Sequence, residues 1–380
     1  MPTLLRCVVS LSLAAGAAAQ TVHLVGPGGF AQIDDALAVA SPGDVVHVQG
    51  GAYGSFHGTV GVTIRGIGGA VMVGGATIAV PANEALHLVD LSIGTTVVSA
   101  GICTFDRCTI TPGSLNGSLY VSDARVDLHE CVVGQSGAPY LAPFGGVPGM
   151  IATNAAISAV DTQFRGRDRE TTFNAPGGAA ILLVASTFHG SRVTADGGDG
   201  LSTGSGVPGP ALSASNATVW LSDSTLNGGR ATDLGSAPWR CPVAVTGTTT
   251  GRLARCVQDP ATCAGGIPTG GPMLGVHRAS PLPSGALLQL DFQTEPNGFV
   301  GVFASFGLAS LTLFELEQPI ALDLATLFPF AVLAADGSGA ASGAWMLPPN
   351  VADYAVWFQG AAAPAPVPLQ ISPVTGGVLR

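Results

Sequence analysis

The chain contains no lysine, because all 14 of its basic residues are arginine. Its 380 residues therefore carry neither a lysine Schiff base nor a lysine-bearing phosphate loop. Charged residues of both signs make up only 10% of the sequence, well below the ~25% of an ordinary soluble domain. The formal net charge of −10 argues against a nucleic-acid partner, which requires a basic face.

An apolar run long enough to cross a bilayer is also missing, so we expect no transmembrane span. Residues 1–20 instead combine a positive charge at Arg6, an apolar core over Cys7–Ala14 and small residues before Gln20. This order is typical of a secretory signal peptide cleaved near Ala19, and the alternative is a buried N-terminal helix. We therefore expect a secreted protein, either extracellular or held at the cell surface.

The strongest internal signal is a repeat. Three segments align without a gap: Leu119–Val133, Met150–Phe164 and Leu212–Leu226. The unit reads apolar-x-apolar-x-acid-(Cys/Ser/Thr)-x-apolar, with period 2 on both sides of a tight bend, which indicates short strands. A unit this short cannot bury its own apolar face, so it must stack on its neighbours as a solenoid.

Two positions of the unit are polar in every aligned copy. Asp123, Asn154 and Asn216 share the first position, and Glu130, Asp161 and Asp223 share the second. A shorter copy at Ile181–Gly190 puts Ala185 in the place of the acid. The residue after the acid is small, which predicts an inward ladder of Cys108, Cys131, Thr162, Ser186 and Ser224.

The N-terminal stretch carries a second pattern. Phe30, Ile33, Leu37 and Ala40 fall on one helical face, which predicts a short helix that closes the apolar end of the solenoid. The pattern Gly-Gly-Phe-x-x-Ile-x-x-Ala-Leu-x-x-Ala-x-Pro-Gly-Asp-x-Val-x-Val runs from Gly28 to Val48. With the repeats, it resembles the pectin-lyase-like superfamily. The resemblance implies a right-handed parallel β-helix over residues 21–264, a fold that hosts lyases, hydrolases, epimerases, adhesins and inert surface proteins.

The sequence pattern changes at a Gly/Pro-rich linker, residues 265–272, and the repeat does not continue after it. Residues 273–380 are therefore predicted to form a small β-sandwich, which resembles the accessory modules of large secreted bacterial proteins. Its expected strands are Ala286–Gln293, Gly298–Phe306, Leu311–Leu316, Phe330–Ala334, Tyr354–Phe358 and Val367–Ile371. The whole chain is thus predicted to be all-β.

The densest charge cluster follows the second repeat. In the superfamily that the chain resembles, polysaccharide lyases use an Arg or Lys base and hydrolases gather several Asp on one face. The catalytic candidates are accordingly Asp161, Arg165, Arg167 and Asp168. The binding candidates are Arg169 and Glu170 in the same cluster, with Tyr140 and Phe144 as rings that stack on sugars or anchor their loop. The alternative is a solvated loop with self-neutralising ion pairs, and a turn role for the acids.

Calcium is the only cofactor that the resemblance suggests, because the superfamily's lyases bind it with carboxylates on neighbouring coils. Asp196 and Asp199 are the candidate ligands. The cysteines leave several pairings open. Cys108 and Cys131 are expected to stack on adjacent coils, either as a disulfide or as two thiols, and Cys256 with Cys263 to close a loop. Cys103 and Cys241 would then be caps or free thiols.

Two functions follow from this sequence. The first is a non-catalytic protein with a structural role or a binding role toward an extracellular polysaccharide or a cell-surface component. It rests on the absence of a compact acid–base–metal set. The second is a polysaccharide lyase or glycoside hydrolase of the pectin-lyase-like type. The residues favour the first, since fold alone predicts activity poorly.

Overall fold

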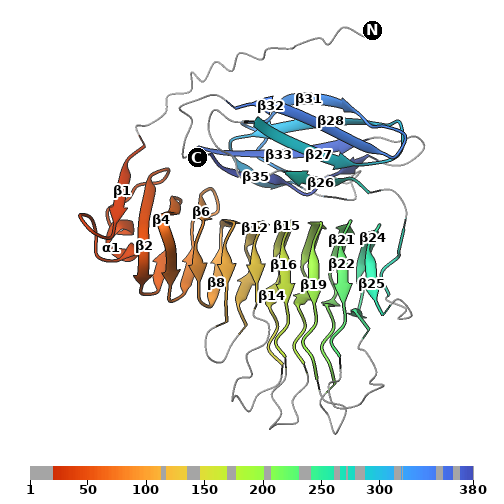
Figure 1. Cartoon of the computed structure of the whole chain (residues 1–380), viewed down its shortest axis with the longest axis horizontal. Helices are drawn as coiled ribbons and strands as arrows, with labels where there is room; N and C mark the ends of the chain where they lie inside the picture. The colour runs from red at the N-terminus through yellow and green to blue at the C-terminus, as the bar shows by residue number, and fades with distance from the viewer. Residues whose placement is uncertain are drawn as a thin grey trace.

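The computed structural model describes residues 20–112, 117–134, 146–168, 177–200, 207–230, 241–260, 266–270, 273–278, 287–311, 318, 320–347, 354–362 and 369–379. From β1 (Val22–Val25) to β25 (Val257–Asp259) the paired strands are parallel and form a right-handed parallel β-helix. The strands that follow are antiparallel and fit a β-sandwich (Figure 1). No helix among these residues is long and apolar enough to cross a membrane.

Each coil of the β-helix contributes a short strand to each of three faces. The first face stacks β2 (Val45–Tyr53), β4 (Thr63–Val73), β6 (Ala85–Val89), β9 (Ile102–Asp106), β12 (Arg125–His129), β15 (Ala156–Val160), β18 (Thr187–Ser191), β21 (Thr218–Ser222) and β24 (Thr250–Ala254). The second face stacks β7 (Ser92–Ile93), β10 (Thr109–Ile110), β13 (Val132–Val133), β16 (Gln163–Arg165), β19 (Thr194–Asp196), β22 (Thr225–Asn227) and β25. The third face stacks β3 (Phe56–Gly58), β5 (Ala76–Ala79), β8 (Thr96–Ala100), β11 (Leu119–Ser122), β14 (Met150–Thr153), β17 (Ile181–Val184), β20 (Leu212–Ser215) and β23 (Val243–Thr246).

Alternation along each strand separates the core from the surface. On β12, Val126 and Leu128 belong to the buried apolar cluster that fills the solenoid. Because side chains alternate along a strand, the intervening Asp127 and the flanking residues of β12 face outward. The parallel register sets Val126 beside Ile157 of β15 in the next coil. The predicted period of 2 is thus what places apolar residues inside.

A bend between the third and first faces requires left-handed backbone. Asp123, Asn154, Ala185 and Asn216 occupy it in successive coils with φ of 51, 50, 49 and 50°. Asn and Asp tolerate this conformation better than other residues with a Cβ, which accounts for their recurrence. We call this the asparagine bend.

The bend between the first and second faces is charged. Its left-handed residues are Asp90, Arg107, Glu130, Asp161, Arg192, Asp223 and Arg255. Three ion pairs join neighbours along this line: Arg107 Nε to Asp90 Oδ1 at 3.0 Å, Arg192 Nε to Asp161 Oδ1 at 2.6 Å and Arg255 Nε to Asp223 Oδ1 at 2.6 Å. The acidic row predicted from the repeat is therefore broken by arginines.

The structure corrects the alignment of the shorter repeat. Ile181 pairs with Met150 and Thr187 with Ala156, so Ala185 lies beside Asn154 at the asparagine bend. Arg192, not Ala185, takes the place of the acid. The alignment was shifted because Ala185-Ser-Thr-Phe188 is similar in sequence to Asp161-Thr-Gln-Phe164.

The inward ladder after the charged bend is confirmed, with one change. Thr162, Ser224, Cys131, Cys108 and Cys256 each donate to the backbone carbonyl two residues earlier. Ser186 belongs to the other bend, and Val193 fills its predicted place.

The disulfide predictions fare less well. Cys108 and Cys131 are free thiols rather than a disulfide, as are Cys103 and Cys256. The prediction that Cys256 bonds Cys263 is therefore wrong. Cys241 is disulfide-bonded, so it is not the free thiol that was one alternative for it. Burial raises the pKa of Cys108 to about 12 and that of Cys256 to about 11, which keeps both thiols protonated.

The N-terminal helix α1 (Ile33–Leu37) is shorter than the predicted Phe30–Ala40. Ile33, Ala36 and Leu37 are buried in the core of the solenoid, and Phe30 and Ala40 pack against it. The helix lies at the N-terminal end of the β-helix, as expected for a cap (Figure 1).

The β-sandwich contains a sheet of β26 (Gly275–Arg278), β27 (Leu287–Gln293) and β32 (Ala340–Met346). A second sheet holds β31 (Phe328–Ala334), β28 (Phe299–Ser305), β33 (Ala355–Ala362), β34 (Gln370–Ile371) and β35 (Thr375–Val378). β29 (Leu308–Leu311) pairs with β30 (Ile320–Leu322). Three of these strands, β26, β32 and β35, were not predicted, because they are short or consist largely of Gly, Ala and Ser. Most of the predicted strand Leu311–Leu316 lies outside the described residues.

The sandwich lies lengthwise on the first face of the solenoid (Figure 1). Val160, at the end of β15, is fully buried in the hydrophobic core of the sandwich. Ile102 of β9 packs against a second sandwich cluster that includes Leu308 and Trp357. The two parts of the chain therefore share buried apolar surface, which the sequence did not predict.

Candidate functional site

The predicted site residues on the second face bind one another. Arg165 and Asp196 are register partners on β16 and β19, with 3.9 Å between Arg165 Nε and Asp196 Oδ2. Both oxygens of Asp196 also accept amide hydrogens, from Gln163 Nε2 at 3.2 Å and Asn227 Nδ2 at 2.7 Å. These four residues form a row of one ion pair and two hydrogen bonds across three coils.

Asp168 and Asp199 join successive coils. Asp168 Oδ1 accepts the backbone N–H of Asp199 at 2.9 Å, and Asp199 Oδ1 accepts that of Arg230 at 2.7 Å. The backbone N–H of Arg167 bonds to Val147 at 3.1 Å. Among the described residues no group of three or more His, Cys, Asp or Glu is placed to hold a metal ion. Calcium at Asp196 and Asp199 stays a prediction.

Asp161 is tied to both parts of the chain. Its carboxylate accepts from Arg192 and lies 2.7 Å from Nδ1 of His277, which β26 of the sandwich supplies. Burial alone would raise the pKa of Asp161, but the bonds from His277 and Arg192 hold the pKa below its usual value. A hollow of 430 Å³ beside Asp161 is lined by the same paired charges. The remaining candidates, Tyr140, Phe144, Arg169 and Glu170, lie outside the described residues.

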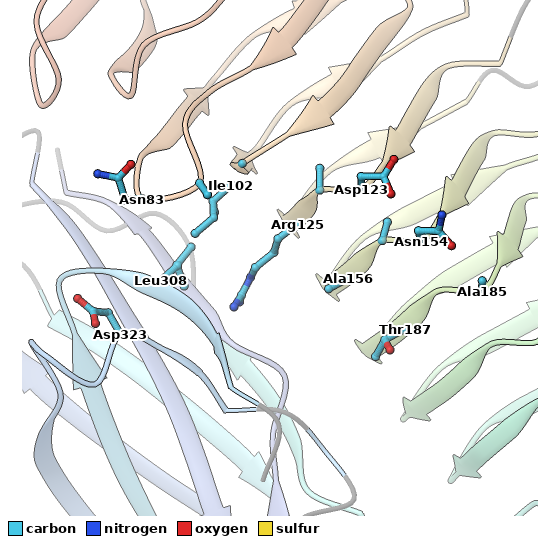
Figure 2. Close-up of a pocket in the computed structure, with 14 residues that line it drawn as sticks. Asn83, Ile102, Asp123, Arg125, Asn154, Ala156, Ala185, Thr187, Leu308 and Asp323 are labelled. Carbon is cyan, nitrogen blue, oxygen red and sulfur yellow. The ribbon is translucent and has the colours of Figure 1, made fainter.

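A larger groove, of 720 Å³, opens between the solenoid and the sandwich. Figure 2 shows its two walls. The solenoid wall is built from the asparagine bend and the first residues of the first face, over successive coils. Leu308 and Asp323 form the sandwich wall, and Asn83 stands at one end. No single segment of the sequence contains this groove, so sequence analysis missed it.

Small residues keep the groove open. Ala124 and Ala155 follow the bend residues of their coils and are buried, and Ala156 and Thr187 begin the adjoining strands. Larger side chains at these places would fill the space between the two walls. The Asp-Ala and Asn-Ala dipeptides of the repeat thus produce a shallow, continuous floor.

Arg125 holds the two walls together. Its Nε and Nη2 donate to the two carboxylate oxygens of Asp127, both at 2.9 Å. Its Nη1 donates to the carbonyl of Ala321 in the sandwich at 3.0 Å. Because all of these nitrogens are engaged and the charge is paired, Arg125 positions the walls and leaves little charge for a ligand.

Three other polar side chains of the groove have no hydrogen-bond partner among the described residues, unlike Asp323, which accepts the backbone N–H of Ala325. Within the described part of the chain, the exposed side chains of Asn83, Asp123 and Asn154 make no hydrogen bond. Asp123 and Asn154 stand side by side on successive coils (Figure 2). The groove therefore offers amide and carboxylate groups that are free to bind a ligand, whereas the charges of the second face are already satisfied. The bend repeat was the only sequence signal for them.

No protein-family model matches the chain, and no curated protein matches it. Among solved structures, it is similar to pectin methylesterase PemA from Erwinia chrysanthemi, with 12% identity, a TM-score of 0.32 and coverage of 67% of this chain and 81% of that one. It is also similar to the Dettilon tailspike protein, with 8% identity, a TM-score of 0.20 and coverage of 89% and 86%. At these scores neither structure bears on function, and the fold rests on the strand pairing described above.

Proposed function

We propose that the chain is a secreted or cell-surface protein without catalytic activity, and that the groove between solenoid and sandwich binds an extended polysaccharide. The observation that carries this proposal is the set of unpartnered polar side chains, Asn83, Asp123 and Asn154, along an open groove. Amides and carboxylates are the groups that exchange hydrogen bonds with sugar hydroxyls. The alanine floor and the side chain of Leu308 offer apolar surface to the C–H faces of a sugar.

The charges of the groove select among polysaccharides. Asp123 and Asp323 line it, while Arg125, the one cation among its described lining residues, is paired with Asp127. A polymer of uronic acids would meet two carboxylates there without a free cation among the lining residues, and like charges repel. The proposed ligand is therefore a neutral glycan.

Calorimetric titration with neutral and uronic-acid oligosaccharides of matched length tests this function. We expect a neutral oligosaccharide to bind and the acidic series to give no heat. Asn154→Ala should weaken the binding, and Asn216→Ala, at the same bend outside the groove, should leave it unchanged. Equal binding of the acidic series, or a silent panel, would contradict the proposal.

One observation favours a second candidate. Asp123 and Asp323 line the groove from its two walls. Glycoside hydrolases use two carboxylates that flank the glycosidic bond to be cleaved. Release of reducing ends from the bound glycan, lost in both Asp123→Asn and Asp323→Asn, would establish a hydrolase. Binding without product supports the non-catalytic protein.

A further inference from the structure

Polar groups buried between the solenoid and the sandwich form a cluster around Arg278. This arginine, on β26 of the sandwich, is completely buried. Its Nη2 donates to Asp106 Oδ1 of the solenoid at 3.2 Å, and its Nε lies 3.3 Å from Nε2 of His129. His129 Nδ1 lies 3.1 Å from the same carboxylate oxygen. Nearby, the backbone N–H of Val276 donates to Ser191 Oγ at 3.1 Å.

Two further histidines lie on the first face, where His87 is partly buried and His189 is buried. The ring centroid of His87 lies 5.7 Å from that of Trp357 of the sandwich, and His87 Nδ1 bonds to Thr104 Oγ1 at 2.7 Å. His189, next to Trp220 on the same face, is 3% exposed, and its Nε2 has no partner among the described residues. The register of the strands places both rings in one outward row.

We propose that the sandwich is a pH-released cover of the solenoid's first face, docked at neutral pH and detached in mild acid when His87, His129 and His189 take up protons. A proton on His129 would set a second cation against Arg278 in a buried site. Protons on His87 and His189 would place charges under the sandwich with no carboxylate of the described residues acting on either ring.

The charged groups around each ring decide the direction of the effect. Asp106 on β9 and Glu130 in the adjacent bend favour a charged His129, and Arg278 opposes it. Burial and Arg278 prevail, and they lower the pKa of His129. Burial lowers the pKa of His87 to about 4 and that of His189 to about 3, and no charged group of the described residues contributes to either shift. Asp106 is itself held by Arg107 as well as by His129 and Arg278.

The linkage has a definite sign. Consider a histidine whose pKa is lower in the docked form than in the released form. Its contribution to the docking constant is largest above its ordinary pKa of ~6.5 and decreases as the pH falls toward its pKa in the docked form. At pH 5, each of His87 and His189 thus reduces the docking constant by about 30-fold relative to pH 7.5. The test uses the protein alone, so its outcome does not depend on the proposed glycan binding.

Small-angle scattering from pH 8 to pH 4.5 measures docking through the radius of gyration. We expect a compact particle above about pH 6.5 and a larger one at the acid end, while far-UV dichroism still reports β-structure. The variant H87Q/H129Q/H189Q should move the transition down by at least about one pH unit. The control His57→Gln, whose side chain is 70% exposed in the N-terminal coils, should not move it.

A disulfide between cysteines placed at Ser191 and Val276 separates release of the cover from unfolding, because the locked protein should stay compact in acid. If the triple variant does not fold, His87→Gln alone should still lower the midpoint. A constant radius down to pH 4.5 in the unaltered protein, or the same midpoint in the histidine variants, would overturn the proposal.

Discussion

Asp123 and Asn154 occupy the same left-handed position in successive coils, and both point unpartnered side chains into solvent at the rim of the groove. The backbone selects these residue types, since Asn and Asp accept a positive φ. The same selection leaves hydrogen-bonding groups at a regular spacing of ~4.8 Å, the distance between neighbouring strands. A structural requirement of the bend thereby creates a row of ligand-binding groups.

Asn154→Ala should reduce the affinity for a neutral oligosaccharide by about tenfold, the value of one hydrogen bond. The bend control Asn216→Ala removes a bond to the backbone N–H of Thr248 (3.0 Å) but no group of the groove. Calorimetric titration of both variants checks the difference. Equal losses of affinity would show that Asn154 acts only through the backbone.

Ala185 is the one alanine of the asparagine bend, with φ of 49°. A Cβ in this conformation costs ~1–2 kcal/mol, and Asn or Gly relieves part of that cost. Ala185→Asn and Ala185→Gly should therefore each raise the free energy of unfolding by about 0.5–1 kcal/mol. Ala156→Gly, in the extended strand β15, should lower it. Chemical denaturation measures all three, and a destabilised Ala185→Gly would refute this account.

Asp106 should make stability fall in strong acid. Burial would raise the pKa of this carboxyl, but the bond with His129 and the charges of Arg278 and Arg107 lower it to about 2. Because the native pKa is below the ordinary value of 3.8, the contribution of Asp106 to the free energy of unfolding is complete above that pH and is lost as the pH falls through 2. Its size is about 2 kcal/mol.

The matched variant is Asp106→Asn. With the sandwich held in place by a disulfide between cysteines at positions 191 and 276 in both proteins, the difference in unfolding free energy between the variant and its parent should shrink by about 2 kcal/mol from pH 5 to pH 2. Asp291→Asn, at a partly exposed position of the central strand β27, should show no such trend. A constant difference for Asp106→Asn would exclude the carboxylate as the source.

Native thiols should resist alkylation. Cys103, Cys108 and Cys131 are buried, so the reagent cannot reach their sulfur atoms. Burial also raises the pKa of each thiol, so the reactive thiolate is scarce. Cys256 is partly exposed and should react first, though slowly. Mass spectrometry after iodoacetamide treatment, with and without denaturant, checks this order. Rapid labelling of Cys131 in the native protein would contradict the packing.

Calcium is expected to have little effect at Asp196. Both oxygens of Asp196 accept amide hydrogens, and an oxygen of Asp199 accepts a backbone N–H. A cation would have to displace these donors. We therefore expect the melting temperature to change by less than about 1 °C on addition of millimolar calcium, whereas a site with submillimolar affinity would raise it by mass action. Such a rise, lost in Asp196→Asn, would establish the predicted calcium ligand.

The repeat made the solenoid predictable because a period of 2 and a bend residue recur in every coil. Where one coil departs from the pattern, the predicted alignment was wrong. Phe188 was aligned with Phe164, although strand pairing sets it beside Ile157. Local similarity cannot reveal such a shift, because only contacts with neighbouring coils fix the register. The inward thiols were predicted as a ladder, but their redox state depends on geometry that the spacing leaves open.

The candidate site was less predictable than the fold. Sequence reasoning selected Arg165 and Asp168 because charge is rare in this chain, yet both are engaged in bonds within the solenoid. The groove instead combines Asn154 with Asp323, which are far apart in the chain. Nothing in either segment indicates that the sandwich folds back onto the first face.

The charged bend has a consequence for how the coils are ordered. Reading along the stack, Arg192 stands between Asp161 and Asp223. Deleting the coil that carries Arg192 would bring those two carboxylates next to each other at strand spacing, and duplicating it would set two guanidinium groups together. Coils that look interchangeable in their apolar residues are therefore not interchangeable in sequence. The charge at the bend of each such coil is matched to the charges of the coils on either side of it.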